Sequence, residues 1–146
     1  MKSIYIAFLS MSLTACMSLP KSPQELQNMG SAKDQFIVNK DLTSVEGNLE
    51  KFLNKCYNSK NRAKLVLNHA QIGPEMGFEK SKANDQVSYS VYMGVDPKLY
   101  SLGIKINKLD ESDSLKIDVV AATVMWKRIF PKLERAANGS DESCPM

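Results

Sequence analysis

The second half of the chain alternates between apolar and polar positions. Apolar residues occupy every second position over 87–95 and again over 100–106, mostly with small or polar residues between them. A period of two predicts half-buried strands. A third alternating segment covers 115–121, and shorter segments of the same kind lie at 35–39 and 62–68. The pattern therefore predicts five strands.

Two segments follow a helical period instead. Apolar residues recur at three- and four-residue spacing from Val45 to Cys56, which predicts an amphipathic helix ending near Tyr57. Thr43 and Glu46 fit a capping box at its start. A second helix is expected to begin near residue 127, because proline is tolerated only in a first turn and Pro131 follows. Its apolar stripe consists of Trp126, Ile129, Phe130, Leu133 and Ala137.

The turn between the two longest strands predicts how they pair. A loop over 96–99 places Pro97 at the second turn position, where its backbone angle fits. Shorter loops either mix the two faces of the strands or strain the proline. The expected pairs are Met93 with Leu102, Val91 with Ile104, and Tyr89 with Ile106.

The predicted element order is β-α-β-β-β-β-α. Consecutive strands with helices on one face predict an α+β two-layer sandwich, in which an antiparallel meander sheet packs on the helices. A curved sheet against a C-terminal helix resembles helix-grip and TBP-like modules by architectural analogy. Residues 16–33 contain Pro20, Pro23 and Gly30 with little periodicity and predict a flexible tether. Residues 34–146 are then expected to form one globular domain.

The first 15 residues have the features of a secretion signal. Lys2 precedes an apolar run that is too short to cross a bilayer, and small residues end it. The tetrapeptide Leu13-Thr14-Ala15-Cys16 resembles the lipobox of bacterial prolipoproteins. This resemblance covers residues 1–16 and implies cleavage before Cys16, whose thiol then receives lipid such as palmitate. The motifs in the rest of the chain indicate no resemblance to a known family.

The same resemblance implies where in the cell the protein is located. A lipoprotein cysteine bears several acyl chains, which hold a membrane far better than one chain does. Met17 follows Cys16, whereas an Asp at this position retains enterobacterial lipoproteins in the inner membrane. We therefore expect a lipid anchor in the outer membrane, with the domain facing the periplasm.

Two cysteines remain after lipidation, Cys56 and Cys144. An even number in an oxidising compartment favours a disulfide between them. Two free thiols or a metal site are the alternatives, although a metal needs more ligands than these cysteines and His69 readily supply. The chain has no C-x-x-C spacing, so a redox enzyme is not expected.

Charge and motifs argue against most catalytic classes. The net charge of +3 is too small to indicate nucleic-acid binding. His69 has no evident nucleophile beside it, and Asp110, Glu111 and Asp113 fit a polar turn better than a weak calcium site. Phosphate-loop, nucleophile-elbow and zinc-protease motifs are missing from the sequence. We expect no enzymatic activity, no cofactor and no resident metal.

A Gly- and Pro-rich loop offers a candidate contact surface. Its residues Ile72, Met76 and Phe78 either cap an edge of the core or contact a partner. The leading interpretation of the chain is a lipid-anchored, noncatalytic envelope protein that acts as a protein-interaction or accessory module for an envelope partner. The alternatives are a carrier of a small apolar ligand, bound between the sheet and the Trp126 helix, and a small enzyme or enzyme inhibitor.

Overall fold

A five-stranded antiparallel sheet forms the centre of the domain, with strand order β1-β7-β6-β5-β4. The computed structural model describes residues 18–58, 66–67, 70–71, 75–84, 86–109 and 114–145. The strands of the sheet are β1 (Ala32–Val38), β4 (Met76–Ala83), β5 (Gln86–Met93), β6 (Leu99–Lys108) and β7 (Leu115–Ala121). The helices are α1 (Pro23–Met29), α2 (Leu42–Tyr57), the 3-10 helix η1 (Val124–Ile129) and α3 (Phe130–Ala137). This content establishes the predicted α+β class.

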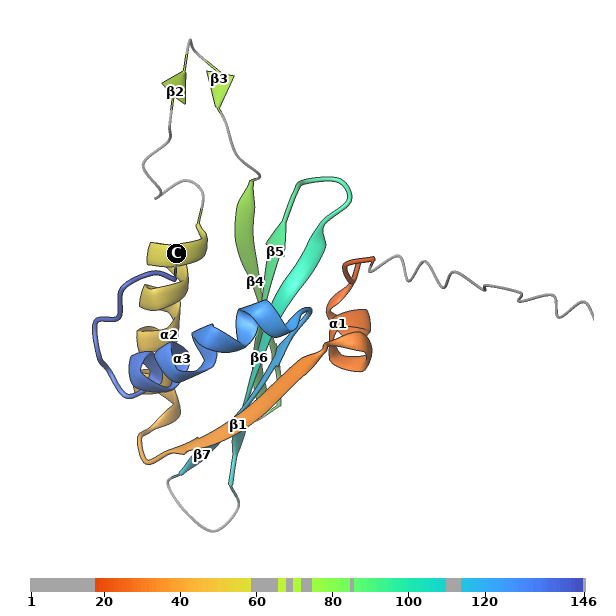
Figure 1. The fold of residues 1–146 in the computed structure, drawn as a ribbon. Coiled ribbons are helices and arrows are strands. Elements are labelled where there is room, and N and C mark those ends of the chain that lie inside the picture. The colour runs from red at the N-terminus through yellow and green to blue at the C-terminus, as the bar shows by residue number, and fades with distance from the viewer. Residues whose placement is uncertain are drawn as a thin grey trace, which may run out of the picture.

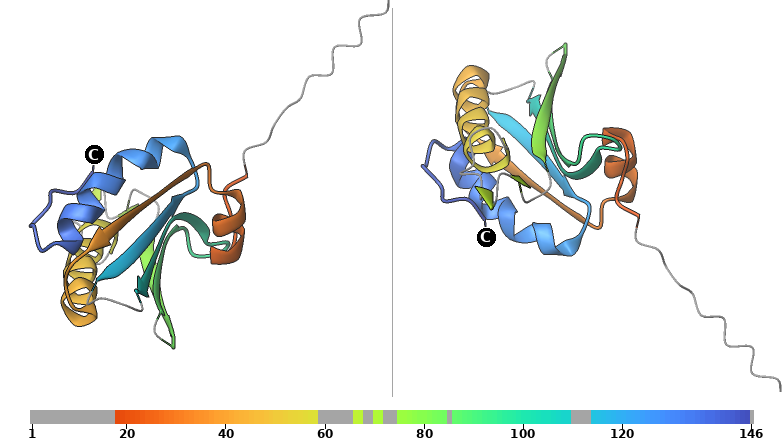
Figure 2. Two further views of the ribbon diagram at one scale, coloured as in Figure 1. Left: turned by 90° about the horizontal axis from the view of Figure 1, so that it is seen from below. Right: turned by 90° about the horizontal axis from the view of Figure 1, so that it is seen from above.

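Helices α2 and α3 lie on one face of the sheet and α1 lies on the other (Figures 1 and 2). We call the face under α2 and α3 the inner face. The apolar stripes predicted for the two helices point into this layer, as do the alternating residues of β5, β6 and β7. Pro131 sits in the first turn of α3, where the sequence placed it. The two predicted helices share one face of the sheet, as expected. The additional helix α1 covers the other face, so the prediction that all helices lie on one face is wrong.

The edge strand β4 was not predicted. Its residues were expected to form a loop, whereas they pair with β5 from Met76 to Ala83. The strand expected at 62–68 is described only at β2 (Val66–Leu67), which pairs with β3 (Ala70–Gln71) in a separate two-stranded sheet. The apolar alternation fails in β4 because Lys80 occupies an inner-face position, where it forms ion pairs with α2.

The pairing predicted for β5 and β6 is wrong by two residues. Gly94 adopts a positive φ of 82°, so β5 ends at Met93 and β6 begins at Leu99. A displacement by two residues leaves the regularly paired side chains on the expected face, since side chains alternate with a period of two. Tyr100 is the exception: the pairing shifts between Val91 and Tyr92, and Tyr100 packs on the outer face. The observed pairs include Val91 with Leu102, Tyr89 with Ile104, and Val87 with Ile106.

The start of α2 also differs from the capping box proposed for Thr43 and Glu46. Asp41 is the N-cap, and its carboxylate accepts a hydrogen bond from the Ser44 backbone N–H at 2.9 Å. Hydrogen bonds from Ser44 hold the pKa of the Asp41 carboxyl below its usual value. The Glu46 carboxylate lies 2.7 Å from the Lys80 ammonium instead.

The flexible tether predicted over 16–33 is corrected for residues 18–33. Ser22 caps α1, and the Leu26 side chain of that helix is fully buried. It packs on the outer face against Tyr100 and Val120. The pattern is hard to detect in the sequence because α1 is short and Leu26 is its one buried residue. The folded domain therefore begins well before residue 34.

Candidate binding pocket

A disulfide joins the last turn of α2 to the C-terminal tail. Cys56 is bonded to Cys144, with their Cα atoms 5.2 Å apart, which confirms the predicted bridge. Ion pairs strengthen the same connection: the Lys55 ammonium lies 2.9 Å from the Asp141 carboxylate. The tail is thereby fixed beside α2. In the described part of the chain, no three potential metal ligands lie close enough together to hold an ion.

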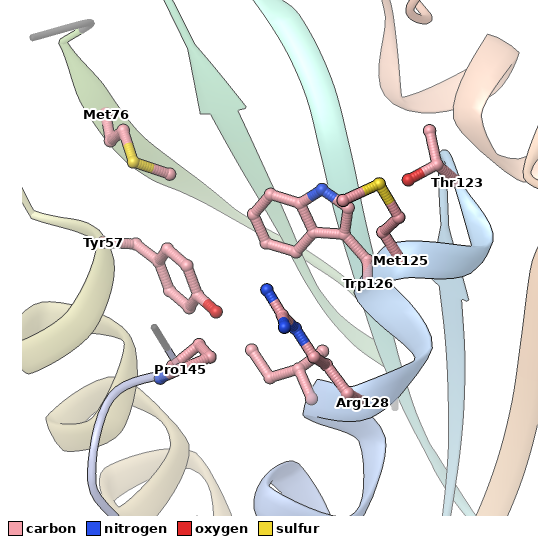
Figure 3. Close-up of a pocket in the computed structure, with 8 residues that line it drawn as sticks. Tyr57, Met76, Thr123, Met125, Trp126, Arg128 and Pro145 are labelled. Atoms are coloured by element: carbon pink, nitrogen blue, oxygen red, sulfur yellow. The ribbon is translucent and has the colours of Figure 1, made fainter.

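A pocket of about 250 Å³ lies beside this bridge (Figure 3). Tyr57 follows Cys56 in the chain, and Pro145 follows Cys144, so the disulfide holds two of its walls together. The start of β4 and the helix η1 complete it. The lining residues are Tyr57, Met76, Thr123, Met125, Trp126, Arg128, Ile129 and Pro145.

Two aromatic rings that pack against each other form one wall of the pocket. The centroids of the Tyr57 and Trp126 rings lie 5.9 Å apart at an interplanar angle of 32°. Tyr57 is almost completely buried, and its ring also meets the edge of Phe52 in the core. Aromatic rings supply large contact areas with few rotatable bonds. This wall is therefore suited to pack against an apolar group.

Arg128 brings a positive charge into these apolar surroundings. Its guanidinium group points toward the space between Tyr57 and Trp126 (Figure 3). Among the described residues, no carboxylate forms an ion pair with it. A guanidinium group presents several N–H donors that match a carboxylate or phosphate. The pocket can thus accept an apolar group that ends in a negative charge.

Val124 and the pocket-lining Met125, which follows it in the chain, form an exposed apolar pair. Their exposed fractions are 66% and 72%, which are unusually high for large apolar side chains. Both belong to η1, the helix that also bears Trp126. Methionine side chains are flexible and adapt to differently shaped partners. We call Val124 and Met125 the rim.

The structure separates the two described residues of the three predicted for partner contact. Met76 lines the pocket, whereas Phe78 packs against the core with its ring centroid 6.2 Å from that of Tyr89. Ile72 lies outside the described residues, as do Cys16, His69 and 110–113. A ligand site beside the Trp126 helix was predicted only as an alternative, and the other lining residues were not predicted. Trp126 was assigned to a core stripe, and the exposed pair beside it was the overlooked signal.

A second polar cluster connects β4 to α2. The Lys80 ammonium lies 2.7 Å from the Glu46 carboxylate and 2.6 Å from that of Glu50. The Tyr89 hydroxyl donates a hydrogen bond to Glu50 at 3.0 Å. The hydrogen bond from Lys80 lowers the pKa of Glu50, while burial raises the pKa of Tyr89. These groups satisfy one another, so the cluster serves to fasten the edge strand to the helix.

No protein-family model matches the chain, and no curated protein matches its sequence. Within the described residues, every helix is too short or too polar to cross a bilayer. The case for a function therefore rests on the pocket, the rim and the N-terminal sequence.

Proposed function

We propose that the protein is a lipid-anchored, noncatalytic envelope protein whose pocket binds a partner protein. The lipobox-like tetrapeptide supports an acyl anchor at Cys16 in the outer membrane, with the domain in the periplasm. The sheet packed on its C-terminal helix supports the analogy with helix-grip and TBP-like modules, which host many binding functions.

The exposed rim beside the aromatic pocket is the observation on which this proposal depends. Burial of a large aliphatic side chain is worth about 1.5–3 kcal/mol, so exposed Val124 and Met125 gain free energy when a partner covers them. Interface energy concentrates where an apolar anchor fills a pocket and neighbouring contacts exclude water. A partner that places one apolar side chain in the pocket, against the packed Tyr57 and Trp126 rings, would use both features.

Site-specific photocrosslinking in living cells tests this proposal. A photoreactive amino acid replaces Met125, and the matched control carries it at Ile37, which is 61% exposed and pairs with Lys116 near the start of β7. We expect one discrete crosslinked envelope protein from position 125, and its loss when Trp126→Ala is added. Equal crosslinking at the two positions, or a product that persists in Trp126→Ala, would contradict the proposal.

A carrier of a small apolar anion is the second candidate, and the Arg128 guanidinium in the pocket favours it. At roughly 30 Å³ per small group, the volume of one water in the liquid, the pocket holds about eight such groups. Octanoate has a suitable length and charge. This alternative differs from the partner-binding proposal because it requires saturable binding of a free small molecule.

Trp126 provides the measurement for the carrier, because it is the single tryptophan of the chain. A carrier predicts that octanoate shifts its fluorescence saturably, that octanol binds more weakly, and that Arg128→Gln weakens octanoate binding. Lys127→Gln is the matched control, since Lys127 is an exposed neighbour that does not line the pocket. A fluorescence signal that octanoate leaves unchanged would remove the carrier and leave the partner-binding proposal.

A further inference from the structure

The described chain begins in contact with the sheet. The Tyr100 backbone N–H donates a hydrogen bond to the Pro20 carbonyl at 2.7 Å, and Pro20 is buried. Leu19 packs against the small apolar cluster that contains Leu26 and Tyr100. Residues from Leu19 onward are therefore part of the folded domain.

This packing sets a limit on how far the domain can stand from a lipid anchor. Three Cα–Cα steps separate Cys16 from Leu19, and at 3.8 Å each they span at most about 11 Å. An extended tether over 16–33 would instead span about 60 Å. An acylated Cys16 must lie at the membrane surface, so Leu19 must lie close to it.

The turn between β5 and β6 lies at the same end of the sheet. Residues 94–98 form this turn, and Tyr100, which binds Pro20, is the second residue of β6. Figure 1 shows the turn and the start of the described chain near one another at that end. Val95 is 66% exposed in the turn.

The side chains around this turn are of the types found at membrane interfaces. The Tyr92 and Tyr100 rings pack with centroids 6.1 Å apart, and the Lys98 ammonium lies 4.5 Å from the centroid of the Tyr92 ring. Lys21 is exposed next to Pro20. Tyr100 is buried, and its hydroxyl donates to Glu79, which also forms an ion pair with Lys98. The exposed Lys21 is therefore the side chain that can direct its charge toward phosphates while its stem covers apolar surface.

We propose that residues 18–21 and the turn 94–98 form a membrane-contacting surface, through which the domain rests directly on the bilayer. Val95 enters the headgroup region and the Lys21 ammonium faces lipid phosphates. The inference rests on the proposed lipidation of Cys16. One exposed valine binds a membrane weakly by itself, so the acyl anchor must supply the high local concentration that keeps this surface in contact.

Quenching by brominated lipid tests the orientation. The full acylated protein is inserted into vesicles of phosphatidylethanolamine and phosphatidylglycerol that contain the brominated lipid. The reporter is Val95→Trp in a Trp126→Phe background, and Ile37→Trp in the same background is the control. Ile37 pairs with Lys116 near the other end of the sheet. We expect loss of most fluorescence from position 95 and little change at position 37.

Two further measurements separate this inference from the anchor itself. The mass of the purified protein reports acylation, and a flexible Gly-Ser segment inserted between Met17 and Ser18 should abolish the quenching at position 95 without changing acylation. An unacylated Cys16 overturns the anchor and the inference together. Acylated protein with equal quenching at both positions, or with no quenching at position 95, overturns the membrane contact alone. Quenching at position 95 that survives the insertion would overturn the claim that the short connection to Cys16 enforces the contact.

Discussion

Leu26 offers the sharpest test of whether the N-terminal segment belongs to the domain. Its side chain is completely buried against Tyr100, Val120 and Ala122. Gly103 makes room for it, since a Cβ there would lie 3.3 Å from a Leu26 methyl carbon. Truncation of a buried leucine to alanine costs about 2–5 kcal/mol, depending on how well the site collapses. The cluster is small and α1 is short, so we expect about 2–3 kcal/mol for Leu26→Ala.

Urea unfolding followed by circular dichroism measures this loss. With a slope of about 1–3 kcal/mol per molar urea, the midpoint should fall by roughly 0.7–3 M while the slope stays unchanged. Met29→Ala in the same helix is the matched control, because Met29 is 57% exposed and should change the free energy of unfolding by less than about 0.5 kcal/mol. Equal midpoints for the two variants would refute the packing of α1 and remove the basis of the membrane contact.

Two other predictions concern the bridge and an ion pair on the outer face. The double variant Cys56→Ala/Cys144→Ala should lose about 4–5 kcal/mol of stability in urea unfolding, because the bridge closes a separation of 88 residues; a loss below about 1 kcal/mol would contradict this estimate. The hydrogen bond from Lys98 lowers the pKa of Glu79 from its ordinary value of 4.5. The ionised Glu79 carboxylate therefore stabilises the fold at pH values above 4.5, and this stabilisation disappears as the pH falls through the lowered pKa. The stability difference between wild type and Glu79→Gln should therefore be larger at pH 7 than under acid conditions, and an equal difference at both would exclude the ion pair as its source.

The parts of the fold that the sequence predicted are those with long, consistent periodicity. The helix from Val45 to Cys56 and the strands β5, β6 and β7 each bury one regular apolar face, which local pattern alone specifies. The disulfide followed from counting cysteines and from the expectation of an oxidising compartment. The register of β5 against β6 was missed because β5 ends before Gly94 and the pairing shifts between Val91 and Tyr92, and several loop lengths are compatible with the same alternation.

The missed elements owe their stability to distant partners. β4 bears lysines on its inner face, and their charges become acceptable only because carboxylates of α2 lie opposite. α1 depends on one leucine that fits over Gly103. Both arrangements arise from tertiary contacts, which no local period reveals.

The pocket was missed for a similar reason. Its walls come from the end of α2, the start of β4, η1 and the tail, which are far apart in the chain. Trp126 has the spacing of a core residue, and the sequence does not show that it meets Tyr57 at the surface. The exposure of Val124 and Met125 is likewise a property of the assembled fold.

Intact mass measurement of the protein extracted from membranes tests the central claim of a lipid-anchored envelope protein most directly. We expect a chain that lacks residues 1–15, bears acyl groups on Cys16 and contains the oxidised Cys56–Cys144 pair. A Cys16→Ala variant should remain uncleaved and without lipid. An unmodified chain that retains residues 1–15, or one cleaved elsewhere without acylation, would contradict the account.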